Sequence, residues 1–132
     1  MTHRIAFIGF RHGHILSLYD AAREREDLEI VAVCEEDAAT RADLTDKGRV
    51  EFTHEKADDL LSATECDIVA VGDTFARRGR LLVAGLEAGH HVIADKPACT
   101  RLAEIDQIST LAADGGLQVS CMLGMRDGPF MR

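Results

Sequence analysis

Residues 4–15 read RIAFIGFRHGHI, an apolar run of strand-forming residues followed by a glycine-containing turn and the start of a helical pattern. A strand that ends in such a turn and continues into a helix is typical of the first unit of a β-α-β fold. Gly9 supplies the tight turn, whereas Arg11 and His14 stand where a G-x-G-x-x-G loop has its second and third glycines. Because any strand-to-helix turn can use a glycine to reverse the chain, the partial motif indicates the fold more than a ligand.

The rest of the chain alternates short apolar runs with longer segments of helical period, which is typical of parallel strands joined by crossover helices. Such crossovers are right-handed in nearly all cases. We therefore expect an α/β fold, a doubly wound parallel Rossmann sheet of about six strands in the order 3-2-1-4-5-6 with helices on both faces. The expected strands are 4–9, 29–34, a weak one at 50–52, 67–72, 91–94 and 117–122.

Helix boundaries are marked by capping residues. Asp37 is expected to cap a helix that ends at Lys47 and Gly48, and Thr100 one that ends at Gly115–Gly116. A further helix is expected over residues 77–88, closed by Gly89. The helix after Thr100 is expected to bury an apolar stripe made of Leu102, Ile105, Ile108, Leu111 and Ala112.

Composition limits the classes of protein to consider. The 132 residues are 46% hydrophobic, enough for the core of one domain, and the formal net charge of −8 argues against sequence-independent binding of nucleic acid. The apolar runs are too short to cross a membrane, and the N-terminus has no signal-peptide pattern, so we expect a cytoplasmic protein. Four cysteines without a C-x-x-C pair are expected to be reduced, largely buried thiols.

Glu35 ends the second expected strand, 21 residues after His14. A carboxylate about 20 residues beyond the glycine loop is where a Rossmann domain holds the ribose hydroxyls of a dinucleotide. Its negative charge would repel a 2′-phosphate, so Glu35 favours NAD over NADP. The alternative is a solvated loop acid that stabilises the start of the following helix.

Residues 88–97 read AGHHVIADKP, which resembles the A-G-K-H-V-x-x-E-K-P signature of the glucose-fructose oxidoreductase and inositol dehydrogenase family, often written Gfo/Idh/MocA. Asp95 replaces the usual Glu, while Lys96 and Pro97 match. The resemblance extends over essentially the whole chain. It departs at residues 73–78, where the family usually has Thr-Pro-Asn followed by a His, and where this chain has Arg78 in place of that His.

The resemblance implies that Lys96 lies beside the nicotinamide ring and the substrate hydroxyl and assists proton transfer. An ammonium group suits this role because it stabilises a developing alkoxide. Lys96 is thus the expected catalytic residue of a dehydrogenase that acts on a sugar, polyol or related hydroxy compound. The expected cofactor-binding residues are Gly9, Phe10, Arg11, His12, His14, Glu35, Asp73, Thr74, Asp95, Lys96 and Pro97.

A metal site is not expected from the histidines. His12 and His14 lie in one loop, His90 and His91 fill the Lys-His place of the signature, and no spaced carboxylate or thiol completes a ligand set. We therefore assign His12 and His14 to the cofactor loop.

The resemblance also implies a second, larger domain that supplies the remaining catalytic residues. We expect residues 1–122 to form the dinucleotide-binding domain and 123–132 to begin the crossing into that domain, so that this chain alone is inactive. Without that domain, apolar surface near the late strands and residues 122–131 is expected to be exposed, so the chain should either self-associate or leave this tail mobile, and we expect a homo-oligomer. The competing interpretation is a non-catalytic Rossmann domain with degenerate cofactor loops, which Arg11, His14 and the stretch Asp73-Thr74-Phe75 favour.

Overall fold

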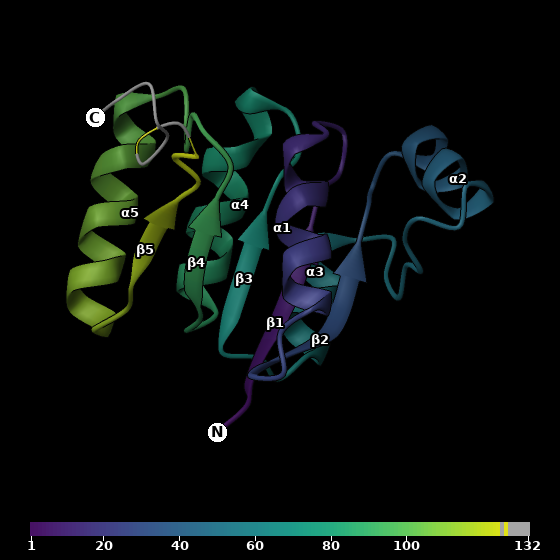
Figure 1. Cartoon of the computed structure of the whole chain (residues 1–132). Helices are drawn as coiled ribbons and strands as arrows, with labels where there is room; N and C mark the ends of the chain where they lie inside the picture. Colours follow the sequence, from purple (N-terminus) through teal and green to yellow (C-terminus); the bar gives the residue numbers. More distant parts are fainter. Residues whose placement is uncertain (125, 127–132) are drawn as a thin grey trace.

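Five parallel strands form one sheet in the order β2-β1-β3-β4-β5 (Figure 1). The computed structural model describes residues 1–124 and residue 126. The strands are β1 (His3–Ile8), β2 (Leu28–Cys34), β3 (Ile68–Val71), β4 (His91–Ala94) and β5 (Val119–Cys121). The helices are α1 (His14–Arg23), α2 (Ala38–Asp46), α3 (Ala57–Ala63), α4 (Phe75–Glu87) and α5 (Leu102–Gly115). The predicted Rossmann-type α/β fold is confirmed.

The expected strand at residues 50–52 does not form, so the count of six was wrong. This segment meets β2 only at an isolated bridge between Cys34 and His54. The Val33 N–H donates to the hydroxyl of Thr53 at 2.9 Å. In a paired strand, a backbone carbonyl of the neighbouring strand would accept this hydrogen bond. Without that third strand, the predicted order 3-2-1-4-5-6 reduces to the observed order.

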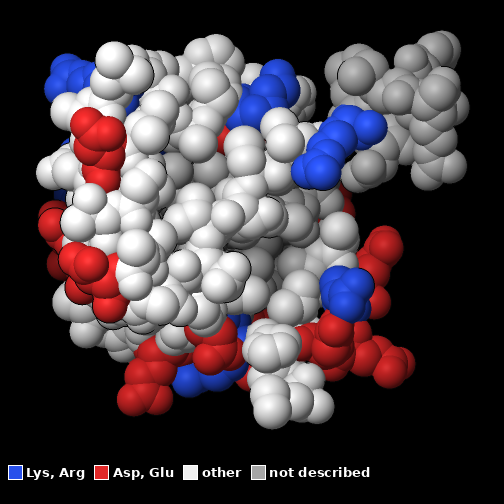
Figure 2. Space-filling model, turned by 90° about the vertical axis from the view of Figure 1, so that its left-hand side faces the viewer, with Lys and Arg blue, Asp and Glu red and all other residues white. Residues whose placement is uncertain are grey.

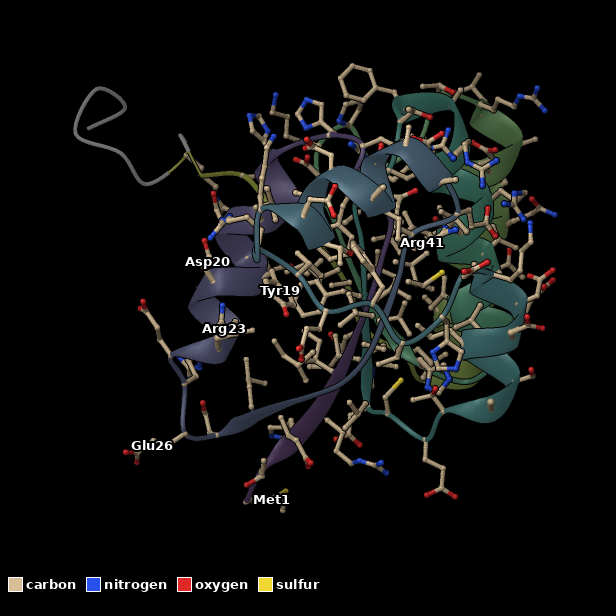
Figure 3. The ribbon with its side chains drawn as sticks, turned by 90° about the vertical axis from the view of Figure 1, so that its right-hand side faces the viewer. Met1, Tyr19, Asp20, Arg23, Glu26 and Arg41 are labelled. Carbon is tan, nitrogen blue, oxygen red and sulfur yellow. The ribbon has the colours of Figure 1, made fainter. Side chains whose placement is uncertain are left out.

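Alternating strand residues pack on two separate helical layers. Ala6 and Ile8 belong to a core cluster with α3, α4 and α5, whereas Ile5 and Phe7 belong to a cluster with α1. Figure 3 shows the same arrangement from the side, with the purple α1 on one side of the sheet and the green helices on the other. α2 lies beyond the β2 edge in Figure 1 and is anchored by buried Leu44.

Most predicted helix ends are confirmed. The backbone N–H of Thr40 donates to the Asp37 carboxylate at 2.9 Å, as expected of an N-cap, and Gly89 and Gly116 adopt φ of 87° and 62° at the ends of α4 and α5. The prediction for Thr100 was wrong, because α5 begins at Leu102 with Arg101 as its N-cap and without a side-chain capping bond.

The buried stripe predicted for α5 was also largely wrong. Ile108 is its one fully buried apolar residue, whereas the side of the helix at Leu102 and Ile105 is 81% and 48% exposed. α5 flanks the sheet at its β5 edge, where a short strand offers little surface to cover a helix (Figure 1). The helical period of the apolar residues predicted the helix but not how much of its surface the rest of the domain buries.

Two glycines let β1 and β3 end in close contact. Gly9 has a φ of 85°, and a Cβ there would lie 2.5 Å from the Cβ of Asp73; a Cβ on Gly72 would lie 2.2 Å from the carbonyl oxygen of Gly9. A side chain at either position would force the two strand ends apart, which is the physical reason for the glycine in the turn.

Among the described residues, none of the helices has the length and apolar character that a membrane span requires.

Candidate cofactor site

The carboxyl ends of four parallel strands bring the predicted site residues to one edge of the sheet, the upper edge in Figure 1. The turn 9–14 follows β1, Glu35 follows β2, Asp73 and Thr74 follow β3, and residues 95–97 follow β4. This is where open α/β sheets bind ligands.

Glu35 is completely buried beneath the glycine turn. One carboxylate oxygen accepts the Phe10 N–H at 2.5 Å and the other accepts the Asp37 N–H at 2.7 Å. Glu35 therefore ties the turn after β1 to the loop after β2 and places a negative charge under the turn. The side chain of Phe10 is buried against Tyr19 and Phe52, so Phe10 presents only its backbone to the turn.

Arg11 lies between two buried carboxylates. Its Nε atom is 3.2 Å from an Asp73 oxygen and 3.6 Å from a Glu35 oxygen, and its side chain is 27% exposed. Asp73, in a left-handed conformation with φ of 58°, also accepts the Thr74 N–H and the Nε–H of Arg77. The cations thus offset most of the negative charge buried here.

Arg78, the residue in the place of the family's usual histidine, is fully buried and braces the site from behind. Its guanidinium donates to the carbonyl oxygens of Gly72, Asp73 and Pro97 at 2.7, 3.1 and 2.7 Å, and it lies 3.5 Å from the Asp95 carboxylate. Five donors in a rigid fork allow one side chain to hold the loops after β3 and β4 together. Burial lowers the pKa of the Arg78 guanidinium, an effect that the nearby Asp95 carboxylate opposes.

Asp95 is 1% exposed and is shared by two histidines. The Nδ1 atom of His12 lies 3.0 Å from one of its oxygens, and the Nδ1 atom of His14 lies 3.5 Å from the other. The backbone N–H of Lys96 also donates to Asp95 at 2.7 Å. The expectation that no carboxylate accompanies the loop histidines was wrong, because Asp95 lies against both of them.

Lys96 is exposed at the mouth of a cleft of about 680 Å³. The cleft runs from α1 to the chain just beyond β5 and is lined mainly by apolar surface; its lining residues are His14, Ser17, Asp95, Lys96, Met122, Leu123, Gly124 and Arg126. An ammonium at the edge of an apolar cleft is suited to stabilise an oxyanion on a small molecule. The Lys96–Pro97 peptide bond is cis.

The turn and the beginning of α1 fit the diphosphate of a dinucleotide. The first N–H groups of a helix have no partners within it and carry partial positive charge, and the first turn of α1 contains no acidic residue. Gly9, with a φ of 85°, allows the tight turn that directs the chain from β1 into the beginning of α1. The residues present therefore fit the cofactor that the turn was predicted to hold.

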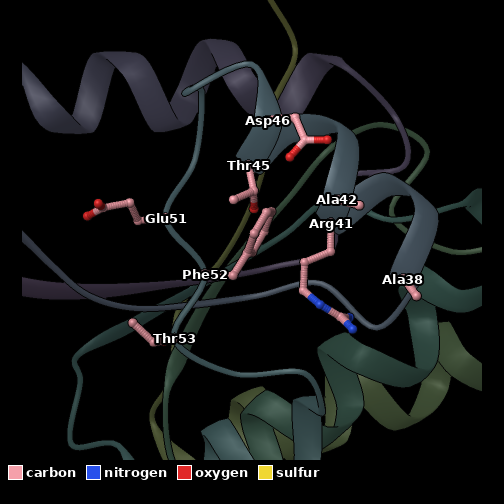
Figure 4. A pocket seen from close by; sticks show the side chains of 8 residues that line it. All are labelled: Ala38, Arg41, Ala42, Thr45, Asp46, Glu51, Phe52 and Thr53. Carbon is pink, nitrogen blue, oxygen red and sulfur yellow. The ribbon is translucent and has the colours of Figure 1, made fainter.

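A second hollow lies under α2, apart from the residues predicted for the site (Figure 4). It has a volume of about 670 Å³ and contains the side chains of Arg41, Thr45 and Phe52. None of the expected cofactor-binding residues lines it, so we place the candidate site at the sheet edge.

The four cysteines are free thiols, as predicted, although only Cys34 is fully buried. Burial, together with the charges of Glu36 and Glu35, raises the pKa of the Cys34 thiol to about 12. Cys34 therefore stays protonated at neutral pH and is not a nucleophile.

Residues 3–123 match the Gfo/Idh/MocA family, described as an oxidoreductase family with an NAD-binding Rossmann fold. The chain belongs to this family. It is thus an NAD-binding Rossmann domain of Gfo/Idh/MocA oxidoreductases, as the signature at residues 88–97 predicted. No functionally curated protein matches the sequence.

Solved structures of similar fold agree with this assignment. A protein from Erwinia carotovora atroseptica described as a putative oxidoreductase is 25% identical, with a TM-score of 0.84 over 95% of this chain and 37% of its own. Myo-inositol 2-dehydrogenase from Lactobacillus plantarum is 16% identical, with a TM-score of 0.81 over 98% of this chain and 38% of its own. Scyllo-inositol dehydrogenase from Lactobacillus casei, solved with NAD(H) and scyllo-inositol, is 20% identical, with a TM-score of 0.76 over 92% and 36%. The last two show the fold alone, and the chain spans 36 to 38% of the length of these proteins.

Sequence reasoning missed the structural role of Arg78. The helical period contained the information, because Arg78 precedes buried Leu81 and Leu82 by three and four residues and thus lies on the buried side of α4. An arginine on an apolar stripe needs polar partners, and the strand-end carbonyl groups of Gly72, Asp73 and Pro97 supply them.

Proposed function

We propose that the full-length protein is an NAD-dependent oxidoreductase that acts on a polyol, sugar or related hydroxy compound. The observation that carries this proposal is the position of Lys96, at the carboxyl edge of the sheet and at the mouth of an apolar cleft. The turn 9–14 and the neighbouring strand ends would hold NAD, which would supply the hydride acceptor for oxidation of the substrate. Lys96 stabilises the alkoxide and passes on the hydroxyl proton.

The other residues of the site orient the cofactor. The turn 9–14 and the beginning of α1 hold the diphosphate, and Asp73, Thr74 and Pro97 shape the walls of the site. The 132-residue chain by itself is proposed to be inactive, because relatives of this fold are about two and a half times its length.

The competing candidate is a non-catalytic Rossmann domain. The observation that favours it is the pairing of Arg11 with Glu35 and Asp73. Arg11 thus places a side chain at the position where the G-x-G-x-x-G loop has its second glycine. NAD-dependent turnover by the full-length protein separates the two, since only the oxidoreductase shows it.

We expect the protein to bind NAD at least about tenfold more tightly than NADP, a difference of about 1.4 kcal/mol. Glu35 and Asp37 place carboxylates at the end of β2, and hydrogen bonds from Thr40 keep the pKa of Asp37 below its usual value, so both repel a 2′-phosphate. Titration calorimetry with both cofactors measures the difference. Glu35→Gln should reduce the difference in affinity between NAD and NADP. Glu65→Gln, at an exposed acid far from the turn, should leave this difference unchanged. Equal or tighter binding of NADP by the unaltered protein would remove Glu35 from cofactor selection.

We also propose that the protein is a homo-oligomer that associates through the side formed by α5 and β5. Four large exposed apolar residues lie on or just beyond these elements: Leu102, Ile105, Val119 and Leu123. Figure 2 shows this side as a broad surface with few charged side chains in its centre and both acidic and basic groups along its edges. Light scattering is expected to give a mass above that of one chain, and Ile105→Asp is expected to reduce it. A monomer at every concentration tested would contradict this proposal.

A further inference from the structure

Three potential metal ligands meet beside the cofactor turn, although they come from two distant parts of the sequence. His12 and His14 lie in and just after the turn that follows β1, and Asp95 lies at the end of β4. One ligand atom from each of these residues lies within 4.8 Å of the other two. Among the described residues, this is the group of histidine, cysteine and acidic side chains that comes close enough to hold one ion.

The distances between the ligand atoms suit a small cation. Tetrahedral zinc with bonds of about 2.0 Å separates its ligand atoms by roughly 3.3 Å. The Nδ1 atom of His12 lies 3.0 Å from one Asp95 oxygen and the Nδ1 atom of His14 lies 3.5 Å from the other, and one ligand atom from each residue lies within 4.8 Å of the other two, so rotation of the side chains has to bring them onto one ion. His14 has the most exposed side chain of the three, at 54%. Its ring can therefore turn to bring its Nδ1 atom closer to the other ligand atoms.

The surroundings of Asp95 hold it as a metal ligand should be held. One oxygen accepts the Lys96 N–H and also faces His14, and the other lies beside the Arg78 guanidinium and faces His12, so an ion would replace the two histidine contacts and keep the other two. Such outer hydrogen bonds fix the direction of a ligating carboxylate. The opposing effect is the positive charge of Arg78, 3.5 Å from one oxygen, which the carboxylate and three carbonyl groups already offset.

The two histidine rings lie side by side and share one carboxylate. Their ring centroids are 4.4 Å apart, and the Nδ1 atoms of both rings face Asp95. Neutral imidazole is the form that binds metals, and a divalent ion would satisfy both nitrogens and the carboxylate together.

We propose that His12, His14 and Asp95 form a binding site for a divalent transition-metal ion such as Zn²⁺. Two imidazoles and one carboxylate are a ligand set that such ions take, with an open position left for water or another oxygen ligand. The open side faces the cleft that Lys96 and Met122 line, because His14 and Asp95 belong to both the ligand set and the cleft. The site stands on this geometry and does not depend on the proposed oxidoreductase activity.

Titration of the metal-free full-length protein with Zn²⁺ tests the proposal, using calorimetry and metal analysis after dialysis. We expect one Zn²⁺ per chain, and at least about tenfold weaker binding by His14→Ala and by Asp95→Asn. His3→Ala is the matched control, since His3 is half-exposed at the opposite end of β1. Replacement of zinc by Co²⁺ should give visible absorption bands that His12→Ala abolishes.

Absence of stoichiometric zinc binding would overturn the proposal, as would binding that survives both His12→Ala and His14→Ala. Circular dichroism of each variant separates loss of the site from loss of the fold, and His14→Ala, at an exposed position, keeps the test valid if Asp95→Asn unfolds. NAD binding measured on the same samples keeps the two proposals apart. A protein that binds NAD but no zinc contradicts only the metal site.

Discussion

Replacing Arg78 with methionine is expected to destabilise the domain by about 3–5 kcal/mol, a large part of the 5–15 kcal/mol that holds a typical domain folded. The substitution leaves the carbonyl groups of Gly72, Asp73 and Pro97 and the carboxylate of Asp95 without their buried donor. Arg78→Lys should not restore stability, because one ammonium cannot reach all these acceptors in the geometry of the guanidinium fork. Urea unfolding followed by circular dichroism measures the change.

Arg80→Met is the matched control for this prediction. Arg80 lies two residues further along α4, is 52% exposed and reaches only Glu36, at 3.9 Å. Its loss should change stability by less than about 1 kcal/mol, as for other surface ion pairs. Equal effects of the two substitutions would show that Arg78 does not brace the site.

Replacing Lys96 with methionine in the full-length protein is expected to lower kcat by at least about a hundredfold while leaving the fold and the affinity for NAD unchanged. General acid-base assistance contributes about 10²- to 10⁴-fold, and the methionine side chain can neither donate nor accept a proton. Lys96→Arg should not restore turnover, because a guanidinium stays protonated. NAD reduction with a panel of inositols and aldoses gives the rates.

Lys47→Met is the control for Lys96. Lys47 is an exposed residue at the end of α2 that pairs with Asp43 at 2.7 Å and does not line the cleft beside Lys96. A Lys96→Met protein that keeps most of its turnover would exclude Lys96 from the mechanism. That result would also remove the main support for the proposal that the protein is an NAD-dependent dehydrogenase.

The sequence predicted those features that local pattern determines. The strand and turn at residues 4–14 and the signature at 88–97 placed Gly9, Asp95 and Lys96 at one edge of the sheet, because parallel strands end at the same edge. The capping role of Asp37 also followed from residue type and position.

Features that depend on tertiary packing were not predictable in the same way. The exposure of Leu102 depends on how little of α5 the short β5 covers, and a helical period does not report this. The approach of Asp95 to His12 joins residues 83 positions apart, so no spacing rule for metal ligands detects it. The burial of Glu35 under the turn likewise depends on the distance between two strand ends.

Amide NMR spectra of the 132-residue chain during NAD titration show whether the turn 9–14 and the neighbouring strand ends hold NAD. We expect shifts at Phe10, Arg11 and His14, at the residues after β2 and β3, and at Lys96. Saturating shifts confined to the hollow between α2 and Phe52, or no shifts up to millimolar NAD, would contradict this expectation.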